Sequence, residues 1–342
     1  MTRILPTDAS IADVAERCGV SERTVSRVLN GSAAVNARTR AMVQEVIDAL
    51  GYKPSARARA LATGRSNLVG LIHDDPNALV LDPVQRGLTA MLGAQGIELV
   101  VHPCRYGSSD LLDDVRGFVQ RSRVDGVIVL PPVSELAELH DAIAQTGTPL
   151  IAIASVPIAG ADMLLPMERE AARDLTRSLI EQGHEDIAFV SGRPAFNSAQ
   201  QRRLGFLDAL DEAGLKPFSI TAGDYSFESG LRCATEILDT ANRPTAIFAA
   251  NDFMAAGVLR VAHGLGIVVP DDLSVAGFDD SSIAQVVTPP LTTINRPMRT
   301  IAERAAQRLL LHLEGGRPAP SDTTQIPLSV VVRQSTGPRR AC

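Results

Sequence analysis

The sequence predicts a small all-α unit followed by a larger α/β unit built on two parallel, doubly wound sheets. Apolar residues recur at helical spacing between Ile11 and Leu50, which indicates three short helices. From Asn67 onward, apolar segments of strand length alternate with amphipathic helices, and the alternation begins again after Pro166. Repeated strand–helix units form parallel sheets with helices on both faces. We therefore expect two similar lobes that share one cleft at the carboxyl ends of their strands.

The first and third helices of the small unit have clear signals. Ser10 and Asp13 have capping-box spacing at the start of a helix over Ile11–Cys18, with Asp in place of the usual Glu or Gln. Another helix is expected from about Arg38 to Leu50. Its buried face is predicted to hold Met42, Val43, Val46, Ile47 and Leu50.

The α/β unit and its boundaries follow from the apolar segments. The expected strands of the first lobe are Leu68–His73, Ile97–His102, Gly126–Leu130 and Leu150–Ile153, and those of the second are Ile187–Val190, Ala246–Ala249 and Leu273–Ala276. We divide the chain into a helical headpiece at residues 1–53, a linker at 54–66 and the α/β unit at 67–342, whose first lobe takes about 67–164 and 297–323 and whose second takes about 165–293 and 324–337.

Charge is distributed unevenly along the chain. Its net charge is −6, but residues 1–66 hold ten basic and six acidic residues, a balance of +4. The remaining residues hold 23 basic and 33 acidic side chains, a balance of −10. A basic end on an acidic body is the asymmetry expected when only that end meets phosphates.

Several classes of protein are disfavoured by the sequence. No apolar run approaches the roughly 20 residues of a membrane span, and the first residues lack the apolar core of a signal peptide, so we expect a cytoplasmic protein without membrane contact. The six histidines show no metal-ligand spacing. Phosphate-loop and nucleophile-elbow motifs are also missing. We therefore expect no enzyme, no cofactor, no catalytic residues and no metal site.

Residues 11–31 have the pattern of a helix-turn-helix unit. Gly19 supplies a tight turn, and Ser21 caps a second helix that runs to about Leu29. Such a helix lies in the major groove of DNA, where arginine pairs with guanine and glutamate accepts from cytosine, while hydroxyls suit phosphates. The side chains expected to face DNA are Ser21, Glu22, Arg23, Thr24, Ser26 and Arg27. An ordinary helical hairpin with a solvated polar face is the alternative.

Longer blocks of the sequence resemble the Lac-repressor/galactose-repressor (LacI/GalR) family. IADVAERCGVSERTVSRVLNGS is similar to the family's headpiece, and RPTAIFAANDFMAAGVLR, LSVAGFDDSSIA and TPPLTTINRPM are similar to blocks of its sensor. The resemblance runs from Ile11 to about Gln334. It implies a periplasmic-binding-protein-like sensor joined to a DNA-binding headpiece, acting as a homodimer on double-stranded, palindromic operator DNA, with a higher oligomer left open. It also adds Asn30 and Tyr52 to the residues expected at DNA.

The linker PSARARALATG aligns with the hinge helix of this family. By resemblance, Leu61 is the leucine that wedges into the central base step of the minor groove, and Arg57 adds attraction to phosphate. Such a short helix is marginal alone in water. A flexible basic linker in the free protein is compatible with this interpretation.

The same resemblance assigns a set of effector contacts in the cleft. They are Asn77, Ser198, Arg202, Tyr225, Asn251, Asp279 and Arg296. A carboxylate, a guanidinium donor, an amide and one flat ring together suit a sugar. Individually, Arg202, Tyr225, Asn251 and Asp279 also have a purely structural interpretation. For Arg296 both kinds stay open: it faces an acidic group of the ligand, or it simply pairs with an acid where the lobes meet. Residues 78–81 replace an aromatic wall found in many relatives.

The predicted function is therefore a ligand-responsive transcription regulator of the repressor type. A small sugar-like effector in the cleft is expected to control its affinity for the operator. The alternative is a regulator of the corepressor type that senses a purine or another nitrogenous metabolite.

Overall fold

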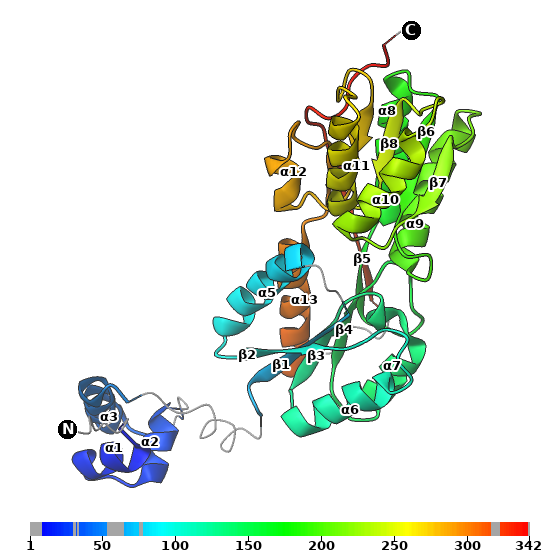
Figure 1. Cartoon of the computed structure of the whole chain (residues 1–342). Coiled ribbons are helices and arrows are strands. Elements are labelled where there is room, and N and C mark those ends of the chain that lie inside the picture. The colour runs from blue at the N-terminus through cyan, green and yellow to red at the C-terminus, as the bar shows by residue number, and fades with distance from the viewer. Residues whose placement is uncertain are drawn as a thin grey trace, which may run out of the picture. The chain divides into compact units, whose positions relative to one another are not determined.

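The computed structural model describes residues 9–29, 32, 34–52, 65–74, 78–315 and 322–340. The chain divides into two compact units, Met1–Asn67 and Leu68–Cys342, each of which has its own core. Figure 1 shows the three helices of the small unit and the two lobes of the larger one. Within the described ranges, no helix combines the length and apolarity that a membrane span requires.

The small unit consists of α1 (Ile11–Cys18), α2 (Glu22–Leu29) and α3 (Ala37–Leu50). The predicted capping box is present: Asp13 N donates to Ser10 Oγ (3.2 Å), and Ser10 N donates to the Asp13 carboxylate (2.7 Å). Hydrogen bonds from Ser10 lower the pKa of Asp13. The core of the unit is formed by Val14, Ala15, Val25, Val28, Val43, Ile47 and Tyr52.

One predicted core position of this unit is wrong. Met42 is 40% exposed, although it precedes the buried Val43 on α3. A helix this short buries only a narrow stripe against two partners, and Val43 and Ile47 already fill that stripe. Val46 and Leu50 are partly buried at its edge.

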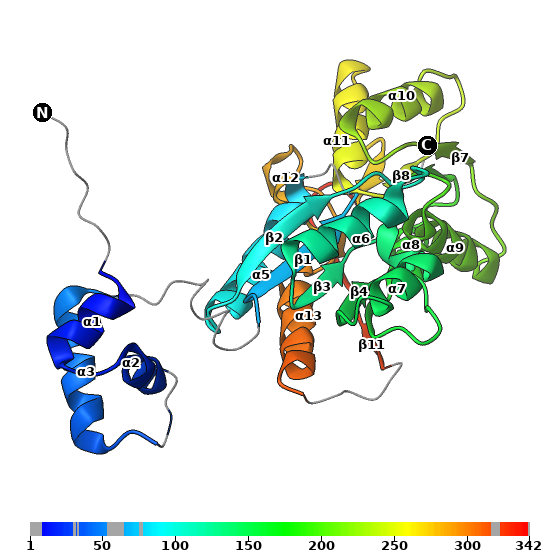
Figure 2. The ribbon, with the colours of Figure 1, turned by 90° about the horizontal axis from the view of Figure 1, so that it is seen from below.

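A six-stranded parallel sheet with the order β11-β5-β4-β3-β1-β2 forms the first lobe. Its strands are β1 (Leu68–His73), β2 (Glu98–Pro103), β3 (Gly126–Val129), β4 (Leu150–Ile153), β5 (Met163–Pro166) and β11 (Thr323–Ile326). One face is covered by α5 (Ala78–Gly93) and α13 (Met298–Leu313), and the other by α6 (Leu111–Ser122) and α7 (Ala137–Ala144) (Figures 1 and 2). Because both of their faces are buried, the inner strands β1, β3 and β4 are almost continuously apolar: Leu71 packs on the α5 side and Ile72 on the α6 side.

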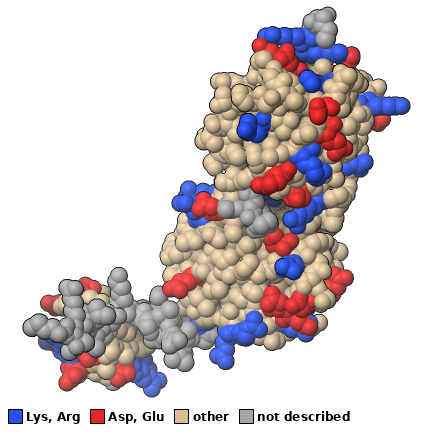
Figure 3. Space-filling model, viewed as in Figure 1, with Lys and Arg blue, Asp and Glu red and all other residues tan. Residues whose placement is uncertain are grey.

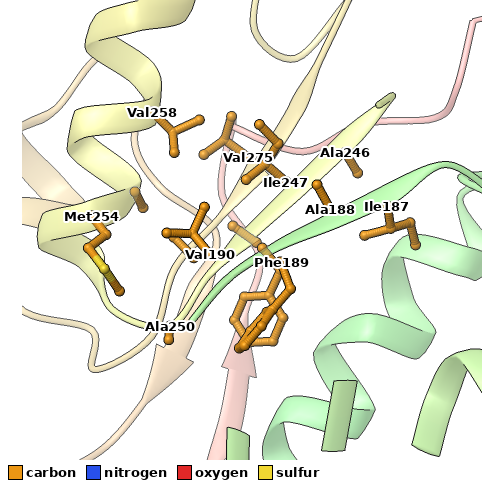
Figure 4. Packing of buried hydrophobic residues seen from close by; sticks show 14 of the residues in the cluster. Ile187, Ala188, Phe189, Val190, Ala246, Ile247, Ala250, Met254, Val258 and Val275 are labelled. Carbon is orange, nitrogen blue, oxygen red and sulfur yellow. The ribbon is translucent and has the colours of Figure 1, made fainter. Parts of the chain in front are cut away.

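The second lobe has a four-stranded parallel sheet with the order β7-β6-β8-β9 and an antiparallel pair, β10-β12. Its strands are β6 (Ile187–Ser191), β7 (Ser219–Ala222), β8 (Ala246–Ala249), β9 (Ser274–Ala276), β10 (Thr293–Asn295) and β12 (Ser329–Val331). Its helices are α8 (Glu168–Glu181), α9 (Asn197–Glu212), α10 (Phe227–Leu238), α11 (Asp252–Gly264) and α12 (Ser282–Val286). In Figure 4, Met254 and Val258 of α11 lie against Val190 and Ile247 of the sheet, and all four are fully buried.

Three short connections join the lobes. They lie between β5 and α8, between β10 and α13, and between β11 and β12. Residues 165–166 and 324–326 belong to the sheet of the first lobe, and not to the second lobe as expected from the sequence, because β11 pairs with β5 along its whole length. On the face of the larger unit seen in Figure 3, acidic and basic side chains lie interspersed among wide uncharged areas.

Candidate functional site

The polar face of α2 is the candidate DNA-reading surface. Glu22, Arg23 and Arg27 are exposed, whereas Val25 and Val28 are buried in the core of the small unit. This division follows from helical spacing, since the three exposed side chains lie opposite the apolar stripe. In the described part of the chain, none of the three forms an ion pair within 4 Å.

Three of the other residues expected at DNA, Ser21, Thr24 and Tyr52, have local roles in the fold. Ser21 Oγ accepts from Thr24 N (3.2 Å) and thereby caps α2, and it also lies 2.9 Å from Thr24 Oγ1, so the two hydroxyls are hydrogen-bonded to each other. Ser26 is half-buried on the same helix. Tyr52 is only 7% exposed and packs in the helical core. Its burial raises its pKa, and the charge of Glu22 adds to this effect.

Four of the predicted site residues lie outside the described residues. Asn30, Arg57 and Leu61 belong to the predicted DNA contacts, and Asn77 to the predicted effector contacts.

A cavity of about 470 Å³ lies between the two lobes of the larger unit. From the first lobe it is lined by Asp74, Val80, Leu130, Pro131, Pro132 and Met298, and from the second by Arg193, Phe196, Ser198, Arg202, Asp224, Tyr225, Ser226, Phe227, Glu228, Asn251, Phe253 and Asp279, with Arg296 from a connection between the lobes. The described effector residues of the sequence analysis thus meet in one place. We call this cavity the cleft.

The floor of the cleft is a ring of four charged side chains. Arg202 contacts both oxygens of Glu168, at 3.2 Å from Nε to Oε2 and 3.1 Å from Nη2 to Oε1. Its Nη2 also lies 3.6 Å from Asp279 Oδ1. Arg296 closes the ring, with Nε 3.3 Å from Glu168 Oε1 and Nη1 3.4 Å from Asp279 Oδ1. Two positive and two negative charges therefore balance inside a buried cluster, which we call the charge ring.

The charge ring joins the ligand-facing part of the cleft to the connections between the lobes. Glu168 is the first residue of α8, directly after the connection from β5, and Arg296 lies in the connection between β10 and α13. The structure thus shows the second of the two alternatives for Arg296: its guanidinium pairs with acids where the lobes meet. Its Nε is not aligned for a hydrogen bond with Glu168, so this donor stays unsatisfied.

Arg202 is the most tightly held member of the ring. It is 2% exposed, its Nη1 donates to the Ala250 carbonyl, and its guanidinium lies 3.8 Å from the centre of the Phe278 ring. Burial alone would lower its pKa, but the charges of Glu168 and Asp279 outweigh burial and raise it. Arg202 therefore stays charged.

Among the described residues, only one carboxylate oxygen of Asp279 forms a side-chain contact, which leaves the other for a ligand. Both of its arginine contacts use Oδ1, and its side chain is 10% exposed in the cleft. Burial raises its pKa, against the opposing effect of Arg202 and Arg296. Its φ of 108° belongs to the left-handed region that non-glycine residues seldom adopt, so the chain bends sharply here to present the carboxylate.

Asn251 and Tyr225 are coupled through the backbone. Asn251 caps α11 by accepting from Met254 N (2.9 Å), and its amide nitrogen donates to the Tyr225 carbonyl (2.9 Å). Tyr225 has a φ of 75°, and its hydroxyl lies 3.1 Å from Ser198 Oγ. The amide of Asn251 thus fixes the position of Tyr225, whose aromatic side chain faces the cleft. Both the nitrogen and the oxygen of this amide already have a hydrogen-bond partner in the protein.

Sequence reasoning missed the aromatic wall formed by Phe196 and Tyr225, and it missed Glu168, the acid that contacts both arginines of the charge ring. Phe196 stacks on Tyr225 at 6.3 Å between ring centres, and Arg193 lies over Phe196. Both follow the carboxyl end of β6, where such folds bind ligands, so their position was a usable signal. Glu168 offered none, because an acid in the first turn of a helix is common.

Two contacts cross the cleft at its edge. Asn197 Nδ2 of the second lobe donates to Glu135 Oε2 of the first (2.9 Å), and Tyr106 meets Phe196 edge to face at 5.5 Å. Glu135 also accepts from Ser155 N (2.6 Å). Its pKa is raised because it is largely buried.

Asp252, a buried acid that interacts with the charge of Asp279, gives a testable pH dependence. It accepts from Thr293 Oγ1 (2.6 Å) and from Ser281 N (2.8 Å). Burial, reinforced by the charge of Asp279, raises its pKa from 3.8 to about 7. Between these values the folded chain binds a proton that the unfolded chain has released, so stability falls as the pH rises.

We expect the wild type to lose about 2–3 kcal/mol more stability than Asp252→Asn between pH 5 and pH 8. Urea unfolding of both proteins at the two pH values measures this difference. The same pH dependence in both proteins would show that Asp252 does not titrate in this range.

Comparison with known proteins decides the family. Residues 10–55 match the bacterial regulatory proteins of the lacI family, and residues 176–336 match the periplasmic binding protein-like domain. Catabolite control protein A of Priestia megaterium is 33% identical over 335 residues, which cover 96% of this chain and 99% of that protein. The chain belongs to the LacI family. This LacI-family protein is also 33% identical to the HTH-type transcriptional repressor PurR of Erwinia tasmaniensis, over 97% of this chain and 98% of that protein.

Solved structures of the family confirm the predicted fold class. A Lac repressor dimer bound to operator and the anti-inducer ONPF matches with a TM-score of 0.85 and 28% identity, over 97% of this chain and 100% of that chain. A complex of the transcriptional regulator CelR with cellobiose matches with a TM-score of 0.71 and 29% identity, over 96% and 99%. This LacI-family chain is thus similar to transcription regulators over nearly its whole length.

Proposed function

We propose that this protein is a dimeric transcription repressor whose affinity for a palindromic operator is controlled by a small effector in the cleft. One observation carries the proposal: the same chain combines an exposed polar face on α2 with a two-lobed cleft, and its similarity to LacI-family regulators spans both. The match to a Lac repressor dimer bound to operator supports the dimer and the DNA partner. A dimer would place two α2 helices on two half-sites.

The linker completes this proposal. Residues 54–66 are assigned as a hinge that orders on DNA, with Leu61 in the minor groove and Arg57 near phosphate. Asn30 and Tyr52 are also expected near DNA. The ring of Tyr52 packs in the core of the small unit, so this residue would contribute by supporting the DNA-facing surface. These roles stay predictions from the sequence.

A sugar-like effector fits the cleft. Asp279 Oδ2 is available to accept from a hydroxyl, and Ser198 and Tyr225 present hydroxyls that donate and accept. The stacked rings of Phe196 and Tyr225 offer a flat apolar surface of the kind on which a sugar ring packs. The similarity to a regulator solved with cellobiose supports this class.

A purine is the second candidate. The same stacked rings would hold a planar base, and the protein is 33% identical to PurR repressors. In both cases Asp279 Oδ2 would be the acceptor: a sugar would donate to it from a hydroxyl, and a purine from a ring N–H group.

The proposed function is tested by selecting DNA sites from a random pool with the purified protein, then titrating the selected site with and without candidate effectors. We expect a site with two-fold symmetry, bound by a dimer, with an affinity that falls steeply as salt rises. Thermal-shift screening against sugars and purines identifies the effector, since a ligand that binds only the folded state raises Tm. Binding of a monomer to one half-site, independent of salt, would refute the proposal.

Arg23 is expected to read a base. Arg23→Ala should relax the selected motif at one position in each half-site, where a wrong base typically costs about 1–3 kcal/mol. Arg17→Ala on α1 removes the same charge from the same unit and should lower overall affinity without changing the motif. An unchanged motif with Arg23→Ala would show that this side chain does not read bases.

A further inference from the structure

The charges that line the cleft do not favour an anion. Its cations are Arg193, Arg202 and Arg296, and its acids are Asp74, Asp224, Glu228 and Asp279. Glu168 lies directly behind this lining, with a side chain that has no exposure. In the described part of the cleft, acids thus outnumber bases by two when Glu168 is included.

The two buried arginines are already neutralised within the protein. Glu168 contacts Arg202 through both carboxylate oxygens and Arg296 through Oε1, while Asp279 Oδ1 contacts both arginines from the other side. A buried charge is stable only when it is paired in this way. Arg193 remains, but it is exposed, lies over Phe196 and interacts with the charge of Asp224.

We propose that Glu168 determines the charge of the effector: because it neutralises Arg202 and Arg296, the cleft binds an uncharged polar ligand and rejects acids and phosphate esters. This inference rests on the proposed role of the cleft as the effector site. It selects free sugars and glycosides over uronic acids and sugar phosphates. If the ligand is a purine, it selects the free base over the nucleotide.

The energetic reason is desolvation. An anionic ligand would leave water and enter a low-dielectric cleft beside Asp279, where no described lining residue supplies an unpaired buried cation to receive it. An uncharged ligand needs only hydrogen bonds, which Asp279 Oδ2, Ser198 and Tyr225 offer. Its apolar part can pack between Phe196 and the first-lobe residues Val80 and Pro132.

The test changes the charge of the ring and uses a matched pair of probes, D-glucose and D-glucuronate. Glu168→Gln gives the ring one net positive charge. The double variant Glu168→Gln/Arg296→Gln restores neutrality without Glu168, and it serves as the control for changes of shape. Binding is measured by thermal shift and by calorimetry with the full chain, in a buffer low in chloride.

We expect D-glucuronate to bind Glu168→Gln at least about tenfold more tightly than the wild type or the double variant. The affinity for D-glucose should change little in Glu168→Gln. The double variant also loses an arginine that holds Asp279, so it is compared by its ratio of D-glucuronate to D-glucose affinity, which should stay at the wild-type value. Binding of D-glucuronate to the wild type in preference to D-glucose would overturn the proposal, and so would the lack of any gain in Glu168→Gln.

If Glu168→Gln does not fold, Asp279→Asn gives the ring the same net charge. Because this variant also removes the carboxylate expected to accept a ligand hydroxyl, its D-glucuronate affinity is compared with its own D-glucose affinity, and a ratio no higher than that of the wild type would also overturn the proposal. These measurements involve no DNA. If the protein bound no operator, the proposed function would be refuted, but the comparison of D-glucuronate and D-glucose binding would still be valid. If it bound an operator but Glu168→Gln gained no affinity for D-glucuronate, only this inference would be refuted.

Discussion

Arg202→Met is expected to lower the free energy of unfolding by about 3–5 kcal/mol, the usual effect of removing one partner from a buried ion pair. The variant leaves Glu168 and Asp279 to share Arg296 alone. It also removes the hydrogen bond to the Ala250 carbonyl and the contact with Phe278. Effector binding should be lost with it, because Asp279 is no longer held from both sides.

The buried carboxylate of Asp279 gives this variant a second signature. With one cation fewer, the pKa of Asp279 should rise further, so the variant should recover stability relative to the wild type as the pH falls. Unfolding by urea, followed by circular dichroism because the chain has no tryptophan, measures both effects. Arg193→Met removes an exposed arginine from the same cleft and should have little effect on stability. A loss below about 1 kcal/mol for Arg202→Met would contradict the role given to the ring.

Gly205→Ala is expected to have the second largest effect. Gly205 lies on α9, where a Cβ atom would come 2.0 Å from the Arg169 carbonyl oxygen and 2.9 Å from Arg173 N of α8. Both clashes are with backbone atoms, so a helix must move. Overpacking of this kind typically costs about 1–3 kcal/mol or more.

This shift would also reach the cleft. Glu168 is on α8 and Arg202 on α9, so separating the helices lengthens the contact between these two side chains. We therefore expect Gly205→Ala to weaken effector binding as well as stability. Gly264→Ala at the end of α11 is the control, since its Cβ would meet no atom within 4 Å. Alanine is favoured over glycine in a helix by about 1 kcal/mol, so this variant should not lose stability. Equal stability of the two variants would contradict the tight approach of α8 and α9.

The fold could be predicted because its pattern is local and repeated. Strands buried on both faces appear in the sequence as short continuous apolar runs, and β1 and β4 have the bounds expected from Leu68–His73 and Leu150–Ile153. The points where the chain changes lobe were harder to predict. Pairing of β11 with β5 depends on residues far apart in the sequence, and no local signal marks it.

The candidate site was predicted as a set of residues but not as a network. Resemblance gathered Arg202, Asn251 and Asp279, and all three line the cleft. What they contact depends on packing: Asn251 caps α11 and donates to the Tyr225 carbonyl, and Arg202 pairs with Glu168. Helix spacing can place a side chain on one face, but it cannot tell which buried acid balances which buried base.

The three connections between the lobes have a consequence for how the protein is made. The first lobe needs α13 and β11, which come after the whole second lobe in the chain. During translation this lobe cannot be completed until residue 326 has left the ribosome, so the apolar face of α5 waits for its partner α13 while the second lobe is synthesised. Long-range closure of this kind slows folding. A message cut short before α13 would therefore yield a chain with an open core and a target for proteolysis, not a smaller working regulator.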